Sequence, residues 1–122
     1  MRVTDPFNLQ RFVDAQSLVY ETVLRELRAG RKTTHWIWFI FPQEKGLGSS
    51  AMSQRYAISS FDEARAYMAH PILGPRLKDC VDLVMSHQDI PLEQMLGGLD
   101  AMKFLSCIEL FSNACGDDWL RR

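Results

Sequence analysis

HWIWFIFPQ, residues 35–43, is the most apolar stretch of the chain. Large apolar and aromatic side chains of this kind are buried in folded proteins, because burial removes their surface from water. Propensity alone favours a strand, but both faces of that strand would be apolar and no convincing partner strand follows in the sequence. The pattern therefore predicts a short buried helix, capped by Thr33 or Thr34 and ended near Pro42.

Helical spacing of apolar residues recurs along the rest of the chain. It predicts a helix that starts at Asp5-Pro6 and further helices over residues 18–29, 51–58, 61–68, 72–87, 91–96 and 99–114. Ser60 and Glu63 form a capping box at one start, and His70-Pro71 ends that helix. Gly74-Pro75 favours a true start of the next helix at those residues. The fold class is therefore all-α, a single domain over residues 1–122 with about seven helices.

Apolar residues nearly encircle the segment 99–114, so we expect this helix to lie buried at the centre of the fold. Lys103 and Ser106 are polar exceptions, three residues apart on this segment. They form either a hydrogen-bonded network in the core or the floor of a pocket, because buried polar groups need partners.

The bulk properties argue against several classes of function. The chain has 122 residues with 14 basic and 15 acidic side chains and a net charge of -1, so a nucleic-acid partner is not expected. The apolar run over residues 36–42 is too short to span a membrane, and residues 1–12 lack a signal-type apolar core. The three cysteines show no metal-type spacing, which favours free thiols, no metal site and a cytoplasmic location. No cofactor can be named from these features.

His35 is the candidate catalytic residue, because it stands at the start of a rigid aromatic segment and a neutral imidazole can accept a proton. The alternative is that His35 packs and bonds a backbone carbonyl. Trp36 and Trp38 face different directions on a helix, so at most one could stack on a ligand ring, and core packing is the simpler role for both. Gln43 follows a proline at a turn, where its amide either reads a ligand or caps the loop.

The segment Glu44-Lys45-Gly46-Leu47-Gly48-Ser49-Ser50, the glycine loop, is only weakly similar to a phosphate-binding loop. Gly46 and Gly48 would let the main chain approach an anion, and Lys45 supplies a positive charge. Arg55 lies about one turn into the following helix, where it could hold a phosphate or carboxylate. The alternative is a flexible loop with a solvated arginine.

Several motifs together resemble the uncharacterised bacterial DUF1810 family. They run in order from residue 5 to about residue 112: DPFNLQRF at 5–12, HW through FPQ at 35–43, GLG at 46–48, YAI at 56–58, HPILG at 70–74, and Asp100, Lys103 and Ser106. The resemblance implies a multihelical fold, which favours the helix over the strand for residues 35–43, but it supplies no activity. Past residue 112 the chain departs from the family pattern, so apolar surface would be left exposed for a partner or for a second copy of the chain, as in a homodimer through the C-terminal region.

Two functions fit this sequence. The first is a pocket for a small anionic ligand that is nucleotide-like or ADP-ribose-like, by analogy with helical proteins that act on such groups. The side chains expected to converge on it, together with the loop glycines, are His35, Trp36, Gln43, Lys45, Gly46, Gly48, Arg55, Tyr56 and Lys103. The second is a non-enzymatic interaction module for a protein partner, which predicts a flat apolar patch instead of a pocket.

Overall fold

The computed structural model describes residues 4–120, and in this range the chain is helical with no β-strand. The elements in chain order are α1 (Gln10–Ser17), α2 (Tyr20–Ala29), α3 (Ile37–Ile40), α4 (Ala51–Arg55), α5 (Phe61–Ala69), α6 (Leu73–Ser86), α7 (Leu92–Leu96), α8 (Gly98–Cys115) and a 3-10 helix, η1 (Asp117–Leu120). The all-α fold expected from the sequence is therefore confirmed, with eight α-helices in the described range where about seven were expected.

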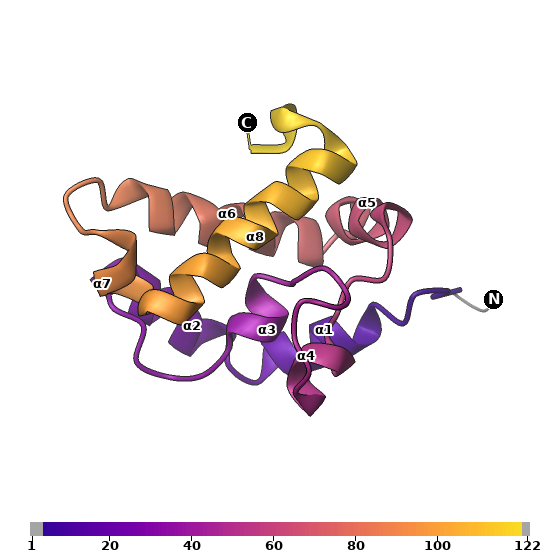
Figure 1. Cartoon of the computed structure of the whole chain (residues 1–122), viewed down its shortest axis with the longest axis horizontal. Helices are drawn as coiled ribbons and strands as arrows, with labels where there is room; N and C mark the ends of the chain where they lie inside the picture. Colours follow the sequence, from indigo (N-terminus) through magenta and orange to yellow (C-terminus); the bar gives the residue numbers. More distant parts are fainter. Residues whose placement is uncertain (1–3, 121–122) are drawn as a thin grey trace.

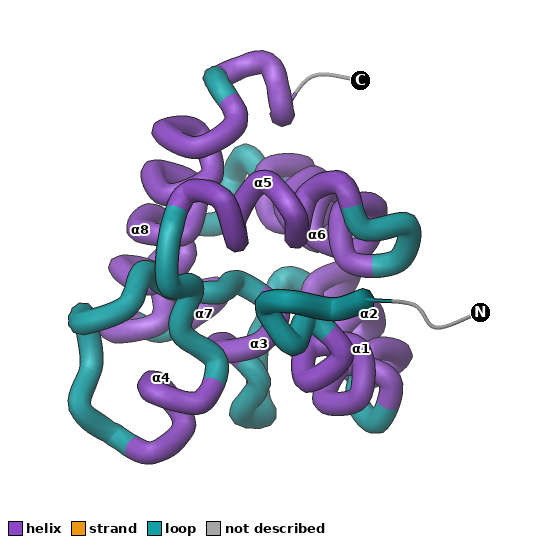
Figure 2. Tube along the Cα trace, turned by 90° about the vertical axis from the view of Figure 1, so that its right-hand side faces the viewer, coloured by secondary structure: helices purple, strands orange, loops and turns teal. Residues whose placement is uncertain are grey.

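The helices form two groups, which α8 and the packing of α6 against α2 join. In Figures 1 and 2, α1 to α4 lie below, α5 and α6 lie above, and α8 runs across both groups. Helix α8 packs against α5, α7 and α3, while α6 packs against α5 and α2. The core therefore lies along the inner side of α8.

The aromatic run adopts the short buried helix that the sequence predicts. Helix α3 packs against α1 on one side and α8 on the other. Just after it, the fully buried ring of Phe41 meets Phe104 of α8 edge to face, with ring centroids 4.9 Å apart. The predicted threonine cap is wrong, because the residue before α3 is Trp36, without a side-chain cap, and the amides of Thr33 and Thr34 donate to Glu26 instead.

Two further helix starts differ from the prediction. Helix α1 begins at Gln10 rather than at Asp5, although the Asp5 carboxylate still accepts hydrogen bonds from the amides of Leu9 (2.8 Å) and Gln10 (3.0 Å). Helix α6 begins at Leu73, one residue before Gly74. A side chain at Gly74 would collide with the backbone oxygen of Met68, so this glycine permits the close approach of α5 and α6.

The N-terminal cap and the end of α5 lie where the sequence predicts them. Ser60 caps the helix, and its hydroxyl oxygen accepts a hydrogen bond from the Glu63 amide at 3.1 Å. The helix ends at Ala69, directly before His70-Pro71. The prediction of a capping box is confirmed in this half, while the Glu63 carboxylate accepts from the amide of Ser59 rather than from that of Ser60.

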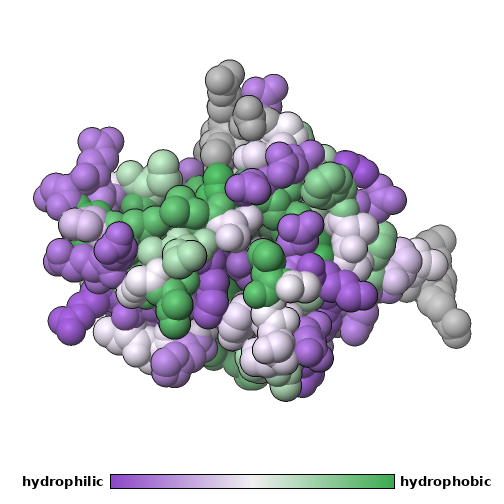
Figure 3. Space-filling model, viewed as in Figure 1, coloured by the Kyte–Doolittle hydropathy of each residue, from purple (hydrophilic) through white to green (hydrophobic). Residues whose placement is uncertain are grey.

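The outer side of α8 is exposed, which corrects the expectation that this helix is buried all round. Leu99, Met102 and Leu105 keep 75%, 67% and 57% of their surface exposed. Figure 3 shows green, apolar side chains gathered across the face on which α8 lies. Apolar composition alone did not indicate which side of the helix has neighbours to pack against.

Candidate functional site

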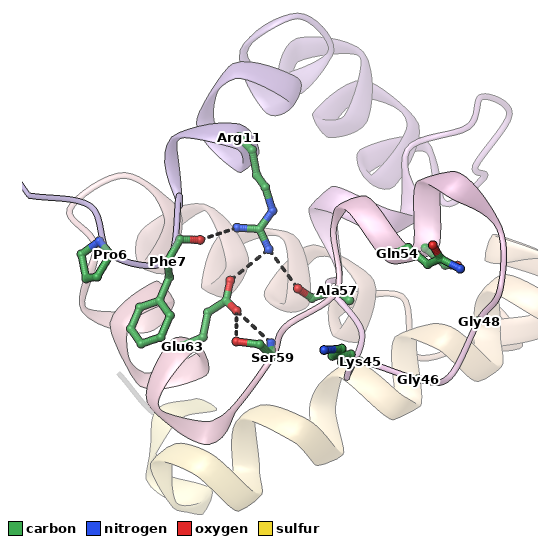
Figure 4. A pocket seen from close by; sticks show the side chains of 11 residues that line it. Pro6, Phe7, Arg11, Lys45, Gly46, Gly48, Gln54, Ala57, Ser59 and Glu63 are labelled. Carbon is green, nitrogen blue, oxygen red and sulfur yellow. Dashed lines mark hydrogen bonds and ion pairs between the residues drawn. The ribbon is translucent and has the colours of Figure 1, made fainter.

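A pocket of about 590 Å³ opens between the N-terminal segment, the glycine loop, α4 and the start of α5. We call it the loop pocket (Figure 4). Its lining residues are Pro6, Phe7, Arg11, Lys45, Gly46, Gly48, Ser53, Gln54, Ala57, Ser59 and Glu63. A volume of this size falls in the range of about 300–1,000 Å³ that is typical of small-molecule sites.

Arg11 holds the back of the loop pocket together. Its guanidinium donates to five acceptors: from Nε to the carbonyl oxygen of Arg55 (2.8 Å), from Nη1 to those of Phe7 (2.7 Å) and Asn8 (2.8 Å), and from Nη2 to that of Ala57 (2.9 Å) and to Glu63 Oε2 (3.0 Å). A guanidinium has five N–H groups, so Arg11 has no donor left for a ligand. Its role is to tie the N-terminal segment to the residues that follow α4.

Glu63 completes this network from the other side. Its side chain is only 3% exposed and forms the ion pair with Arg11, while its Oε1 accepts from the Ser59 amide (2.8 Å) and hydroxyl (2.7 Å). The ion pair neutralises both charges, and the hydrogen bonds satisfy the carboxylate. Glu63 therefore has a structural role in the pocket wall and is not a free general base.

The glycine loop is anchored at its start. The amide of Lys45 donates to the Ile58 oxygen at 2.9 Å, and the amide of Ile58 donates to the Gln43 oxygen at 2.8 Å. The main chain at Lys45 is thus held in place, while its ammonium group makes no hydrogen bond or ion pair with the described residues. Among the charged residues of the loop pocket, Lys45 alone keeps an unneutralised charge.

Both glycines of the loop are required by the backbone or by packing. Gly46 has φ +95°, a left-handed conformation that other residues adopt at a cost. A Cβ at Gly48 would lie 2.7 Å from that of Ser53, so no larger residue fits without moving the loop. The bend of the loop around the pocket therefore depends on these two positions.

Only three of the residues that were expected to converge line the loop pocket: Lys45, Gly46 and Gly48. His35, Trp36, Gln43, Arg55, Tyr56 and Lys103 lie outside it. The expectation of one shared cavity behind the aromatic run is therefore corrected. The physical reason is that the run packs into the core, where its polar atoms already have partners.

At the start of the run, Trp36 and His35 point in different directions. Trp36 is 1% exposed, and its indole Nε1 donates to Glu26 Oε1 at 3.0 Å. His35 precedes it on the surface and is exposed, away from the loop pocket. At the other end, Gln43 is buried and its Nε2 donates to the carbonyl oxygens of Phe41 (2.9 Å) and Lys103 (2.6 Å), which attaches the loop to α8.

The remaining three residues have packing partners of their own. The Lys103 ammonium lies 4.0 Å from the centre of the Trp38 ring and 3.5 Å from Asp100. Tyr56 is buried, with its ring centroid 5.3 Å from that of Phe39. The Arg55 guanidinium lies 5.6 Å from the Tyr56 ring on the surface. The side chain of Lys103 thus contacts Asp100 and Trp38, and the buried hydrogen bond of this residue is made by its main-chain oxygen, which accepts from Gln43.

Glu26 has a strongly shifted carboxyl pKa among the described residues. Burial of the side chain works to raise its pKa, but hydrogen bonds from the Thr34 hydroxyl, the two threonine amides and the Trp36 indole outweigh this and lower the pKa to about 2. The carboxylate stays charged and organises the residues before α3.

Burial raises the pKa of the Cys80 thiol to about 12 and that of Cys107 well above its usual range, so neither thiol is an activated nucleophile.

Sequence reasoning missed the residues that shape the pocket wall. Arg11 and Glu63 are 52 positions apart, and no local pattern connects them. Phe7 was noticed only within the family motif. The capping box indicated the position of Glu63 at the start of a helix. It did not indicate that Glu63 pairs with Arg11.

Two structural findings bear on cofactors and membranes. In residues 4–120, no three His, Cys, Asp or Glu side chains come close enough together to hold a metal ion. None of the helices in the described range is both long and apolar enough to cross a membrane.

Comparisons with known proteins agree with this fold. Residues 6–121 match the family model described as "Protein of unknown function (DUF1810)", so the match continues past residue 112. The crystal structure of the conserved hypothetical protein Rv1873 from Mycobacterium tuberculosis is similar, with a TM-score of 0.90 and 50% sequence identity over 94% of this chain and 84% of that chain. The search of curated proteins gave no match.

Proposed function

The chain belongs to the DUF1810 family, whose function is unknown, and we propose that it binds a small anionic ligand in the loop pocket. The observation that carries this proposal is the ammonium of Lys45, which has no partner and stands beside a pocket whose other charges are neutralised. A positive charge next to an open loop main chain attracts a phosphate or carboxylate group. Lys45, Gly46 and Gly48 are the proposed contact residues.

The ligand class that we propose is nucleotide-like or ADP-ribose-like. The pocket volume of about 590 Å³ accommodates a molecule of this kind, and its lining combines polar groups with Pro6 and Phe7. A cytoplasmic location, where such ligands are abundant, is part of the proposal. It is supported by three free cysteines, two of them buried.

Replacing Lys45 with alanine is expected to weaken binding of AMP or ADP-ribose by about tenfold or more, because one charge-assisted contact is lost. Isothermal titration calorimetry measures the two dissociation constants directly. Lys78→Ala is the matched control, since Lys78 lies on α6 and does not line the loop pocket. Unchanged affinity in Lys45→Ala, or no binding of either ligand by the unmodified protein, would contradict the proposal.

The exposed row on α8 favours a second candidate, an interaction module for a protein partner or a second copy of the chain. Leu99, Met102 and Leu105 form the apolar surface that this alternative requires. The form of this candidate that involves a second copy of the chain has a direct test. Self-association gives a mass in light scattering that rises with protein concentration, whereas a monomeric ligand-binding protein gives a constant mass.

A further inference from the structure

The two ends of the loop pocket differ in chemistry. Figure 4 shows Pro6 and Phe7 together at one end, and Gly48 and Gln54 at the other, with Lys45 and Gly46 on the side of the glycine loop. The apolar end comes from the segment before α1, and the polar end comes from the loop and α4. A ligand that fits both ends must itself have an apolar part and a polar part.

The apolar end offers an aromatic surface. Phe7 is half-buried against the core, and it lines the pocket beside the rigid ring of Pro6. Its carbonyl oxygen accepts from Arg11 Nη1 at 2.7 Å, which fixes the main chain of this residue. Flat rings bind well against such a surface, because stacking buries area on both partners at little cost in conformational entropy.

The polar end offers one net positive charge. Arg11 has used its five donors, and the Arg11–Glu63 pair contributes no net charge to the pocket. Lys45 is then the one lining cation left to neutralise a ligand. One ammonium group can lie beside one phosphate group, and a second phosphate group would find no further unpaired cation in the lining.

Resting on the proposed function, we infer that the ligand is a molecule with one flat ring and one separate anionic group, as in an aryl or nucleoside monophosphate. The ring lies against Phe7 and the anionic group lies beside Lys45. This narrows the proposed class, because the second phosphate group of ADP-ribose would have no unpaired cation of the lining beside it.

Four probes separate the parts of this inference: AMP, ribose 5-phosphate, which lacks the ring, adenosine, which lacks the anion, and ADP-ribose, which has two phosphates. Calorimetry with the unmodified protein is expected to show AMP binding at least about tenfold more tightly than each of the other three. Phe7→Ala should weaken AMP binding by about tenfold and leave ribose 5-phosphate unchanged. Phe61→Ala, an exposed phenylalanine of α5 outside this pocket, is the matched control.

The outcomes distinguish this inference from the proposed function. Equal binding of AMP and ribose 5-phosphate would contradict the inference that the ligand has a flat ring. Tighter binding of ADP-ribose than of AMP would contradict the inference that it has a single anionic group. The proposed function survives in both cases. Absence of binding by every anionic probe overturns both. The probe series on the unmodified protein decides the matter even if Phe7→Ala does not fold.

Discussion

Replacing Arg11 with alanine is expected to lower the free energy of unfolding by about 3–5 kcal/mol. The substitution leaves the Glu63 carboxylate buried without its counter-ion, with a side chain 3% exposed. It also removes the donor that joins the carbonyl oxygens of Phe7 and Asn8 to those of Arg55 and Ala57. The N-terminal segment and the residues after α4 then lose their main polar link.

Urea denaturation with linear extrapolation measures this loss. Arg31→Ala is the matched control, because Arg31 is exposed and its side chain makes no hydrogen bond or ion pair in the described structure. A surface substitution of this kind changes stability by about 0.5 kcal/mol or less. If Arg11→Ala and Arg31→Ala have the same stability, the network around Arg11 does not hold the pocket wall as described.

The second large effect is expected at Glu26, which is 6% exposed. Its carboxylate accepts from the amides of Thr33 (2.8 Å) and Thr34 (3.1 Å), the Thr34 hydroxyl (2.6 Å) and the Trp36 indole (3.0 Å). Glu26→Ala leaves these donors without their acceptor, so we expect a loss of about 3–4 kcal/mol in urea denaturation. Glu21→Ala, an exposed glutamate on the same helix, should cost less than about 1 kcal/mol. A similar loss in the free energy of unfolding for both substitutions would contradict the structural role of Glu26.

The same residue predicts a pH dependence of stability. The pKa of Glu26 is about 2 in the folded protein against an ordinary 4.5, so the unfolded chain binds the proton more readily. The contribution of Glu26 is therefore complete above pH 4.5 and is lost as the pH falls towards 2, by about 3 kcal/mol in total. Glu26→Gln should lack this part of the acid destabilisation when unfolding is measured at pH 7 and pH 3. An equal loss of stability between pH 7 and pH 3 in the unmodified protein and in Glu26→Gln would contradict this prediction.

Local features of the fold could be predicted from the sequence because their causes are local. Ser60 caps α5 through the residue three positions on, and His70-Pro71 ends the same helix by its own backbone geometry. The strand-or-helix question for residues 35–43 was different. Periodicity and propensity pointed in opposite directions there, and the family resemblance favoured the helix that the structure contains.

Features that depend on distant partners could not be predicted in the same way. Glu26 satisfies the amides of Thr33 and Thr34, although the sequence suggested that these threonines cap α3 themselves. The outer face of α8 carries leucine and methionine side chains like those of its inner face, so their exposure could not be inferred from composition.

The candidate site was predicted in part. The glycine loop was identified from Gly46 and Gly48, whose backbone demands are local, and Lys45 came with it. His35 borders the aromatic run, which makes it a candidate from the sequence, but Trp36 turns inward to Glu26 and leaves His35 on the surface. The other wall of the pocket, from Phe7 to Glu63, is assembled by contacts of long sequence separation through Arg11.

The most direct test of the proposed binding site is an NMR titration of the ¹⁵N-labelled protein with AMP. The account predicts that the amide signals of Phe7, Lys45, Gly46 and Gly48 shift progressively with ligand, while those around His35 and Lys103 stay unchanged. Shifts confined to the neighbourhood of His35, Gln43 and Lys103, or no shifts at millimolar AMP, would contradict it.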